Sequence, residues 1–207
     1  MENLELKSGN FFKGQKEFRK EYRENVNGWY NCFIHLGMIF SIGGIGIYYF
    51  SSHIEKIIWW EWLIVPITLI FANLFEWWIH KYVMHKPLNF PGAKAIYSRH
   101  TLQHHQFFTE HEMRFAGTHD WRVTLFPPYA LAIFIAVLSA PAVIFLNLVI
   151  SSNVGWLFII TTTSFYLLYE IMHFCCHVDD NIFVRNMPFI NTITVSYTHL
   201  TLPTTVF

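Results

Sequence analysis

Four long apolar stretches limit what this chain can fold into. They cover about residues 29–50, 57–79, 128–150 and 154–174. Each approaches the roughly 20 residues that a helix needs to cross about 30 Å of hydrocarbon. Inside a bilayer the backbone must satisfy its own hydrogen bonds, and a helix does so within one segment. We therefore expect an all-α integral membrane protein with four transmembrane helices.

The composition agrees with a membrane protein and argues against binding to nucleic acid. The chain is 53% hydrophobic and 14% charged, whereas soluble domains carry about 25% charged residues. Its 14 Lys and Arg residues balance 14 Asp and Glu residues, so there is no net positive charge to attract phosphates. Three cysteines are too few for a disulfide framework, and we expect them to be reduced.

The basic residues are placed asymmetrically along the chain. Six precede residue 29 and six lie between Lys81 and Arg122, while Lys56 stands alone between the first two apolar stretches. Cytoplasmic segments of membrane proteins are enriched in Lys and Arg. We therefore expect a cytoplasmic N-terminus, with the second and fourth helices running inward. Their ends then emerge on the same side as the loop at 80–121.

Seven of the twelve histidines fall into three clusters. These are His80 and His85 in HKYVMH, His100, His104 and His105 in HTLQHH, and His173 and His177 in HFCCH. Helical residues four apart share a face, so the second and third clusters can each aim two imidazoles at one point. His80 and His85 are five apart, and we expect the helix to unwind before Pro87 so that both face inward. The topology predicts all three clusters on the cytoplasmic side.

Seven histidines exceed the three or four protein ligands of a single zinc site, so the spacing predicts two metal ions. Neutral imidazole suits Fe, Zn, Cu and Ni. Nearby polar side chains could orient the ligating rings by accepting their second N–H. The candidates for this supporting role are Glu76, His119, Asp120 and Glu170. We expect no separate catalytic acid or base beyond the metal ligands.

Other functions would also gather histidines in a membrane protein. A metal transporter should place its ligands along a path near the bilayer midplane, whereas these clusters are expected at one face. A haem protein needs only paired axial histidines. A non-enzymatic scaffold should bind metal weakly. A membrane metal-binding or transport protein without oxygenase activity therefore stays open as the alternative.

The three clusters resemble the histidine boxes of the fatty acid hydroxylase and sterol desaturase superfamily. EWWIHKYVMH, RHTLQHHQFF and YEIMHFCCH match the first three boxes in order, and GTHDWRVTLFPP resembles the linking segment, over about residues 72–193. The resemblance implies a non-haem di-iron oxygenase, in which zinc could substitute for iron. It implies hydroxylation or desaturation of a lipid such as a fatty acid, sterol or carotenoid, with O2 and electrons from a redox partner.

The chain departs from that pattern near its end, where the family's final HX2HH box is missing. Instead it reads VSYTHLTLPTTVF, and Val195 to Thr205, read back into codons, resembles a transposon sequencing adapter translated in frame. We therefore expect a cytoplasmic segment at 1–28 and a hydroxylase-like membrane domain at 29–194 that is incomplete at its C-terminus. Residues 195–207 are expected to be a non-native tail, and the metal centre of this chain could then be incomplete and inactive.

Overall fold

The computed structural model describes residues 14–109, 112–178 and 184, and the chain forms two compact units. The apolar unit comprises Asn31–Trp77 and Leu125–Ile171. The histidine unit comprises the described parts of Met1–Tyr30, Trp78–Thr124 and Met172–Phe207. The expected tail at 195–207 lies outside the described residues.

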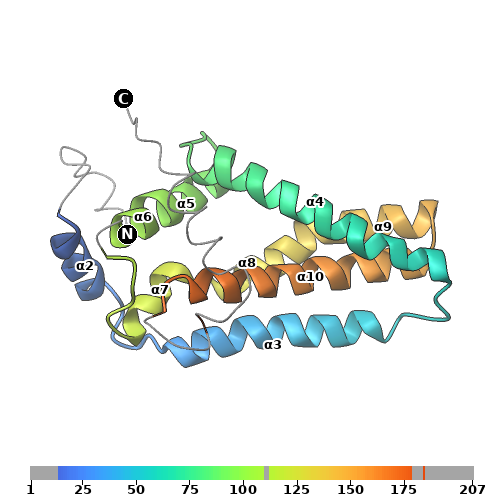
Figure 1. Cartoon of the computed structure of the whole chain (residues 1–207), viewed down its shortest axis with the longest axis horizontal. Helices are drawn as coiled ribbons and strands as arrows, with labels where there is room; N and C mark the ends of the chain where they lie inside the picture. Colours follow the sequence, from blue (N-terminus) through green and yellow to red (C-terminus); the bar gives the residue numbers. More distant parts are fainter. Residues whose placement is uncertain (1–13, 110–111, 179–183, 185–207) are drawn as a thin grey trace. The chain divides into compact units, whose positions relative to one another are not determined.

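Four helical stretches are long and apolar enough to cross a membrane, as expected. The first is α3 (Cys32–Ser51) and the last is α10 (Ser152–Cys175). The second joins η1 (Trp59–Leu63), α4 (Ile64–Ile79) and η2 (His80–Met84). The third contains η4 (Thr118–Asp120), α7 (Trp121–Thr124), α8 (Pro128–Ile133), η5 (Phe134–Ser139) and α9 (Ala140–Val149). Figure 1 shows these elements along the chain. Within the described residues the fold is all-helical, apart from one isolated bridge between Thr109 and Glu112.

Side chains at the helix starts set where the apolar helices begin. Asn31 Oδ1 accepts hydrogen bonds from the N–H groups of Phe33 and Ile34 at 2.9 and 3.0 Å, at the first turn of α3. Ser151 Oγ accepts from Val154 N–H at 3.2 Å, at the first turn of α10. These caps satisfy N–H groups that a helix leaves without internal partners.

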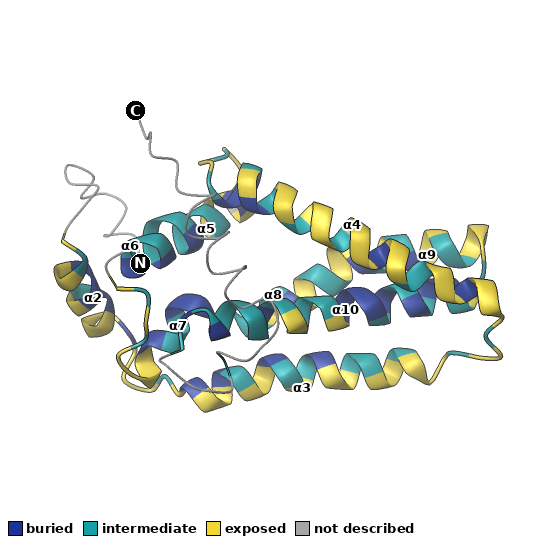
Figure 2. Ribbon diagram, viewed as in Figure 1, coloured by how far each residue is buried: buried dark blue, intermediate teal, exposed yellow. Residues whose placement is uncertain are grey.

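Within the apolar unit, α10 supplies much of the packing. Of its most apolar 18-residue window 44% is buried, against 6–11% for the other three stretches. A Cβ added at Gly43 of α3 would lie 2.6 Å from Leu167 Cδ1 of α10, so the glycine permits a close approach of the two helices. Exposed residues follow the outer faces of α3, α4 and α9 in Figure 2, and many are large and apolar. Apolar surface of this extent fits contact with lipid.

One buried carboxylate holds together two connections of the apolar unit. Glu61 is 2% exposed and accepts hydrogen bonds from Ile58 N–H, Ser151 Oγ and Asn153 Nδ2. Asn153 also donates to the carbonyl of Lys56. A buried carboxylate is costly unless it is hydrogen-bonded, and here the segment before α4 supplies the acid while the turn before α10 supplies the donors.

The histidine unit has a small core of its own. It contains α2 (Gln15–Glu24), η2, α5 (Pro91–Tyr97), η3 (Ser98–His104), α6 (His105–Phe107), η4 and α7, with the last residues of α10. Phe18 and Tyr22 are four residues apart and lie on one face of α2. They form a hydrophobic cluster with Val26, Phe107, Phe108 and Val123. The helix α2 is therefore packed against the segment that follows the HTLQHH motif.

Candidate metal centre

Two of the three histidine clusters lie on π-helical turns. His80 begins η2 and His85 directly follows it, while His100 and His104 lie on η3 and His105 begins α6. A π-helix closes its hydrogen bonds at i+5, so residues five apart come to the same side. This geometry aligns His80 with His85 and His100 with His105. The sequence predicts a helix that unwinds before Pro87, and in the structure a widened π-helical turn at His80–Met84 brings the two rings together.

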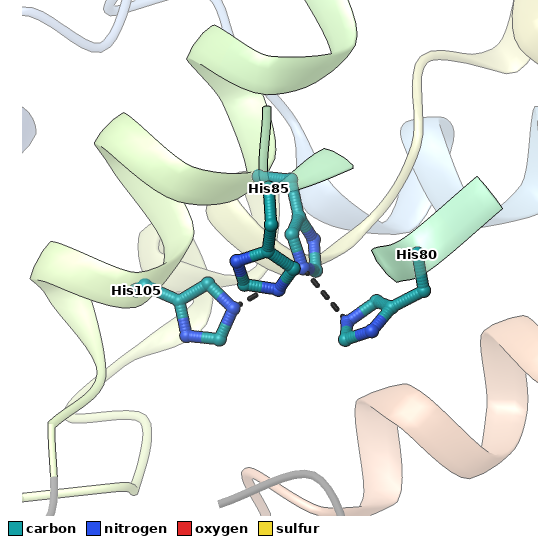
Figure 3. A group of neighbouring side chains, drawn as sticks. His80, His85 and His105 are labelled. Carbon is teal, nitrogen blue, oxygen red and sulfur yellow. Dashed lines mark hydrogen bonds between the residues drawn. The ribbon is translucent and has the colours of Figure 1, made fainter. Parts of the chain in front are cut away.

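The first set of rings, called here the four-histidine group, comprises His80, His85, His100 and His105. Each offers a ring nitrogen within 4.8 Å of the others. His100 Nε2 lies 3.0 Å from His80 Nε2 and 3.1 Å from His105 Nε2. Figure 3 shows the labelled rings of His80, His85 and His105 converging, with these contacts dashed. The ring centroids are 4.7–5.0 Å apart; four of the five neighbouring ring pairs meet edge to face, and the rings of His85 and His105 are tilted by 46°.

The second set, the three-histidine group, comprises His104, His173 and His177. His104 Nε2 lies 3.2 Å from His173 Nε2, and the rings of His104 and His177 have centroids 5.0 Å apart. Phe108 stacks on the His177 ring at 3.8 Å with an interplanar angle of 19°. The aromatic ring of Phe108 thus covers one face of the His177 imidazole.

The spacing of the ring nitrogens fits a bound transition metal. Nitrogen ligands at about 2.0–2.1 Å from a metal, in tetrahedral or octahedral positions, lie about 2.9–3.4 Å from one another. The three Nε2 contacts of 3.0–3.2 Å fall within that range. His85 Nε2 is buried and has no hydrogen-bond partner among the described residues. If these rings held a cation, His85 Nε2 could coordinate it, and the buried nitrogen would then no longer lack a partner.

Burial favours the neutral form of the rings that lie outside the membrane-length helices, and metal binding requires that form. The pKa of His105 is lowered to about 3 and the pKa of His177 to about 4, mainly because both rings are buried. Burial, and then the neighbouring imidazoles, hold the pKa values of His100 and His104 well below the usual 6.5. Burial also lowers the pKa of His85. Within the described residues both groups contain imidazole only, a donor set that suits Fe, Zn, Cu or Ni and not Mg or Ca.

Backbone carbonyls orient part of this cluster. His177 Nδ1 lies 2.8 Å from the carbonyl oxygen of Met113, so Nδ1 carries the proton and Nε2 keeps its lone pair for a metal. Phe115 N–H donates to the carbonyl of His177 at 2.9 Å. Thr101 Oγ1 donates to the carbonyl of Met84 at 2.6 Å and thereby ties η3 to η2. Sequence reasoning did not find these contacts, because main-chain carbonyls have no sequence signature.

The predicted supporting residues lie in different settings. Asp120 is 1% exposed and binds the Arg23 guanidinium through two hydrogen bonds of 2.8 and 2.9 Å, besides accepting from Ala116 N–H. Glu170 is also 1% exposed and accepts from Phe126 N–H at 3.2 Å. His119 is exposed, and Glu76 is half-buried on α4. The carboxylate of Asp120 thus anchors α2.

Searches against protein-family models, characterised proteins and solved structures found no match for this chain. The two histidine groups are therefore characterised by their spacing in the sequence and by their geometry.

Proposed function

We propose that this protein is a membrane-bound di-iron oxygenase that hydroxylates or desaturates a lipid with O2. The observation that supports the proposal is the pair of adjacent all-histidine groups in a chain with four membrane-length apolar helices. Neither a single structural zinc site nor a haem needs seven converging imidazoles.

Two ions are proposed because the rings divide into two sets that share one helical segment. His100 and His105 belong to the four-histidine group, whereas His104 between them belongs to the three-histidine group. The rings of His100 and His104 are nearly parallel, at 9°, with centroids 5.5 Å apart. Two ions held by these sets would be close neighbours, as in enzymes that use two metals together.

Iron is proposed over zinc because of the resemblance to the hydroxylase superfamily, since imidazole accepts both metals. Bound iron would supply the redox chemistry with O2 that amino-acid side chains cannot supply. The seven histidines would hold the metal ions. Phe108, stacked on His177, would keep bulk water from the centre. Met113, through its carbonyl, would hold the His177 tautomer that leaves Nε2 available.

The substrate class and the location follow from the same proposal. A chain with large exposed apolar faces on its long helices would reside in a bilayer, where a fatty acid, sterol or carotenoid is the accessible substrate. The distribution of Lys and Arg favours a cytoplasmic N-terminus and a cytoplasmic metal centre. Electrons would come from a redox partner on that side.

Metal analysis of the detergent-purified protein tests the proposal. After reconstitution with ferrous iron under nitrogen we expect two irons per chain, and one or fewer in His100→Ala. The control is His53→Ala, which removes an exposed histidine outside both groups and should keep two irons. Activity is tested with a final HX2HH box restored in place of residues 195–207. Exposure of that protein to O2 and a reductant in lipid vesicles should then give a lipid product that has gained one oxygen or lost two hydrogens.

Other outcomes separate the rival function. Tight metal binding together with metal release across a vesicle membrane, and no O2 consumption, would favour a transporter. Binding of no metal by the wild-type protein would end both readings.

A further inference from the structure

We infer that Arg19 is a positioning residue for the three-histidine group, acting through the backbone that holds His177. The inference rests on the proposed metal centre and adds to it a residue of the N-terminal helix α2, outside the histidine motifs. Loss of Arg19 is expected to weaken metal binding by the three-histidine group and to spare the four-histidine group. The role of Arg19 can therefore be tested separately from the existence of the metal centre.

Arg19 is a buried cation whose Nε and one terminal nitrogen both donate to main-chain oxygens. It is 7% exposed, its Nε donates to the carbonyl of Phe107 at 2.8 Å, and one terminal nitrogen donates to the carbonyls of Glu112 and Arg114 at 3.1 and 3.0 Å. Its guanidinium also lies over the Phe107 ring, 4.6 Å from the centroid. Arginine is rarely buried to this extent unless its donors are satisfied.

A neighbouring side chain supports the same carbonyls. Gln15, one turn earlier on α2, donates from Nε2 to the carbonyls of Phe107 and Glu112 at 2.9 and 2.7 Å. Its Oε1 accepts from Thr109 Oγ1 at 2.8 Å. Gln15 and Arg19 of α2 therefore donate hydrogen bonds to the backbone at Phe107 and again at 112–114, after the HTLQHH motif.

The carbonyls that Arg19 holds flank the carbonyl that orients His177. Met113 lies between Glu112 and Arg114 in the chain, and its oxygen accepts the Nδ1–H of His177 at 2.8 Å. Without the guanidinium, Gln15 would still hold the Glu112 carbonyl, but the Arg114 carbonyl would lose its Arg19 donor, and the Met113 peptide would be free to rotate on that side. His177 would then lose the partner that fixes its tautomer and ring plane.

Among the described residues, the link from Arg19 toward the four-histidine group is its hydrogen bond to the Phe107 carbonyl at the end of α6, and Gln15 donates to that same carbonyl. The polar contact to His85 there comes from Thr101 Oγ1, at 3.5 Å from Nδ1, and Thr101 in turn is tied to the carbonyl of Met84. Those contacts run between η2 and η3 without α2. Removal of the guanidinium should therefore weaken one metal site and spare the other.

The test is a titration of the detergent-purified full chain with Co2+, read by visible absorption and by bound metal per chain. Two reference variants mark the sites: His177→Ala removes a ligand of the three-histidine group, and His85→Ala removes one of the four-histidine group. Arg19→Met keeps the bulk of the side chain without its donors, and Arg19→Lys keeps the charge with fewer directed donors. Lys20→Ala changes an exposed cation on the same helix, with a side chain 77% exposed, and is the matched control.

We expect wild type and Lys20→Ala to bind two Co2+ ions with the same affinities. Arg19→Met should bind one ion tightly, with the residual spectrum of His177→Ala, and the second about 10–100-fold more weakly, the usual effect of losing a contact that orients a ligand. Arg19→Lys should fall between the two. Unchanged binding of both ions by Arg19→Met would overturn the inference. Equal loss of both ions in Arg19→Met and Arg19→Lys would also overturn it, since that indicates general unfolding. If wild type binds no Co2+, the proposed metal centre fails first.

Discussion

His104 and His105 are consecutive in the chain, yet their imidazoles belong to different histidine groups. Their ring centroids are 5.5 Å apart and their planes are inclined by 85°. Successive residues on a helix project about 100° apart, so one residue step is enough to turn from one group to the other. The pair sits where η3 ends and α6 begins, and it is the shortest covalent link between the two groups.

This relationship predicts that the two groups can be emptied separately. We expect His104→Ala to lose the metal of the three-histidine group and His105→Ala to lose that of the four-histidine group, each with at least about a 100-fold loss of affinity at its own site. The double variant should bind neither ion. The measurement is bound metal per chain by mass spectrometry after dialysis. Loss of both ions in each single variant would contradict the division into two groups. In either single variant, lipid oxidation should stop.

The buried histidines predict that the metal-free protein loses stability as the pH falls. Burial lowers the pKa of His105 to about 3 and the pKa of His177 to about 4, while the unfolded rings titrate near 6.5. Between those values the unfolded state binds more protons than the native state, so stability decreases as pH falls below about 6.5. Each ring contributes up to about 1.4 kcal/mol per pH unit.

Thermal unfolding of chelator-treated protein at pH 7.5 and pH 5.5 checks this sign. The midpoint should be lower at pH 5.5, and His105→Gln should reduce the difference because one titrating ring is gone. An unchanged or higher midpoint at pH 5.5 in the wild-type protein is the opposite result. Added metal should raise the midpoint at pH 7.5, because it binds the native state.

Two neighbouring glycines of α3 offer a matched pair for packing in the apolar unit. A Cβ at Gly43 would approach Leu167 Cδ1 to 2.6 Å, whereas a Cβ at Gly44 would meet no atom within 4 Å. We expect Gly43→Ala to destabilise the protein by about 1–3 kcal/mol through overpacking. Gly44→Ala should be neutral or slightly stabilising, since alanine favours helix by about 1 kcal/mol over glycine. Unfolding in detergent measures both, and equal midpoints for the two variants would refute the close approach at Gly43.

The ion pair between Arg23 and Asp120 predicts that α2 contributes to stability. Asp120 is buried, but the Arg23 side chain is 38% exposed, so the attraction is partly screened by solvent. We expect Arg23→Met to cost about 1–2 kcal/mol and to lower the thermal midpoint by about 2–8 °C. Lys16→Met, which changes an exposed cation on the same helix, should have no measurable effect. A Lys16→Met loss as large as that of Arg23→Met would show that charge alone, and not the pair, is responsible.

Sequence pattern predicted the helical spans closely. The expected stretches at 29–50 and 154–174 correspond to Cys32–Ser51 and Ser152–Cys175. They could be predicted because the length and hydropathy of a membrane-spanning helix are local properties of the sequence. The third stretch begins earlier than expected, at Thr118, where short helical turns precede the apolar helix. Those turns are held by Asp120 and its contacts with α2, which no local pattern could indicate.

The histidine spacing showed which residues are candidates for metal binding, since four-residue intervals on a helix place side chains on one face. How the seven rings divide into four and three was decided by tertiary structure. The division depends on π-helical turns at η2 and η3, whose i+5 geometry cannot be distinguished from an α-helix by composition. The role of Arg19 was likewise invisible in the sequence, because its partners are carbonyl oxygens about 90 residues away, and every residue carries such an oxygen.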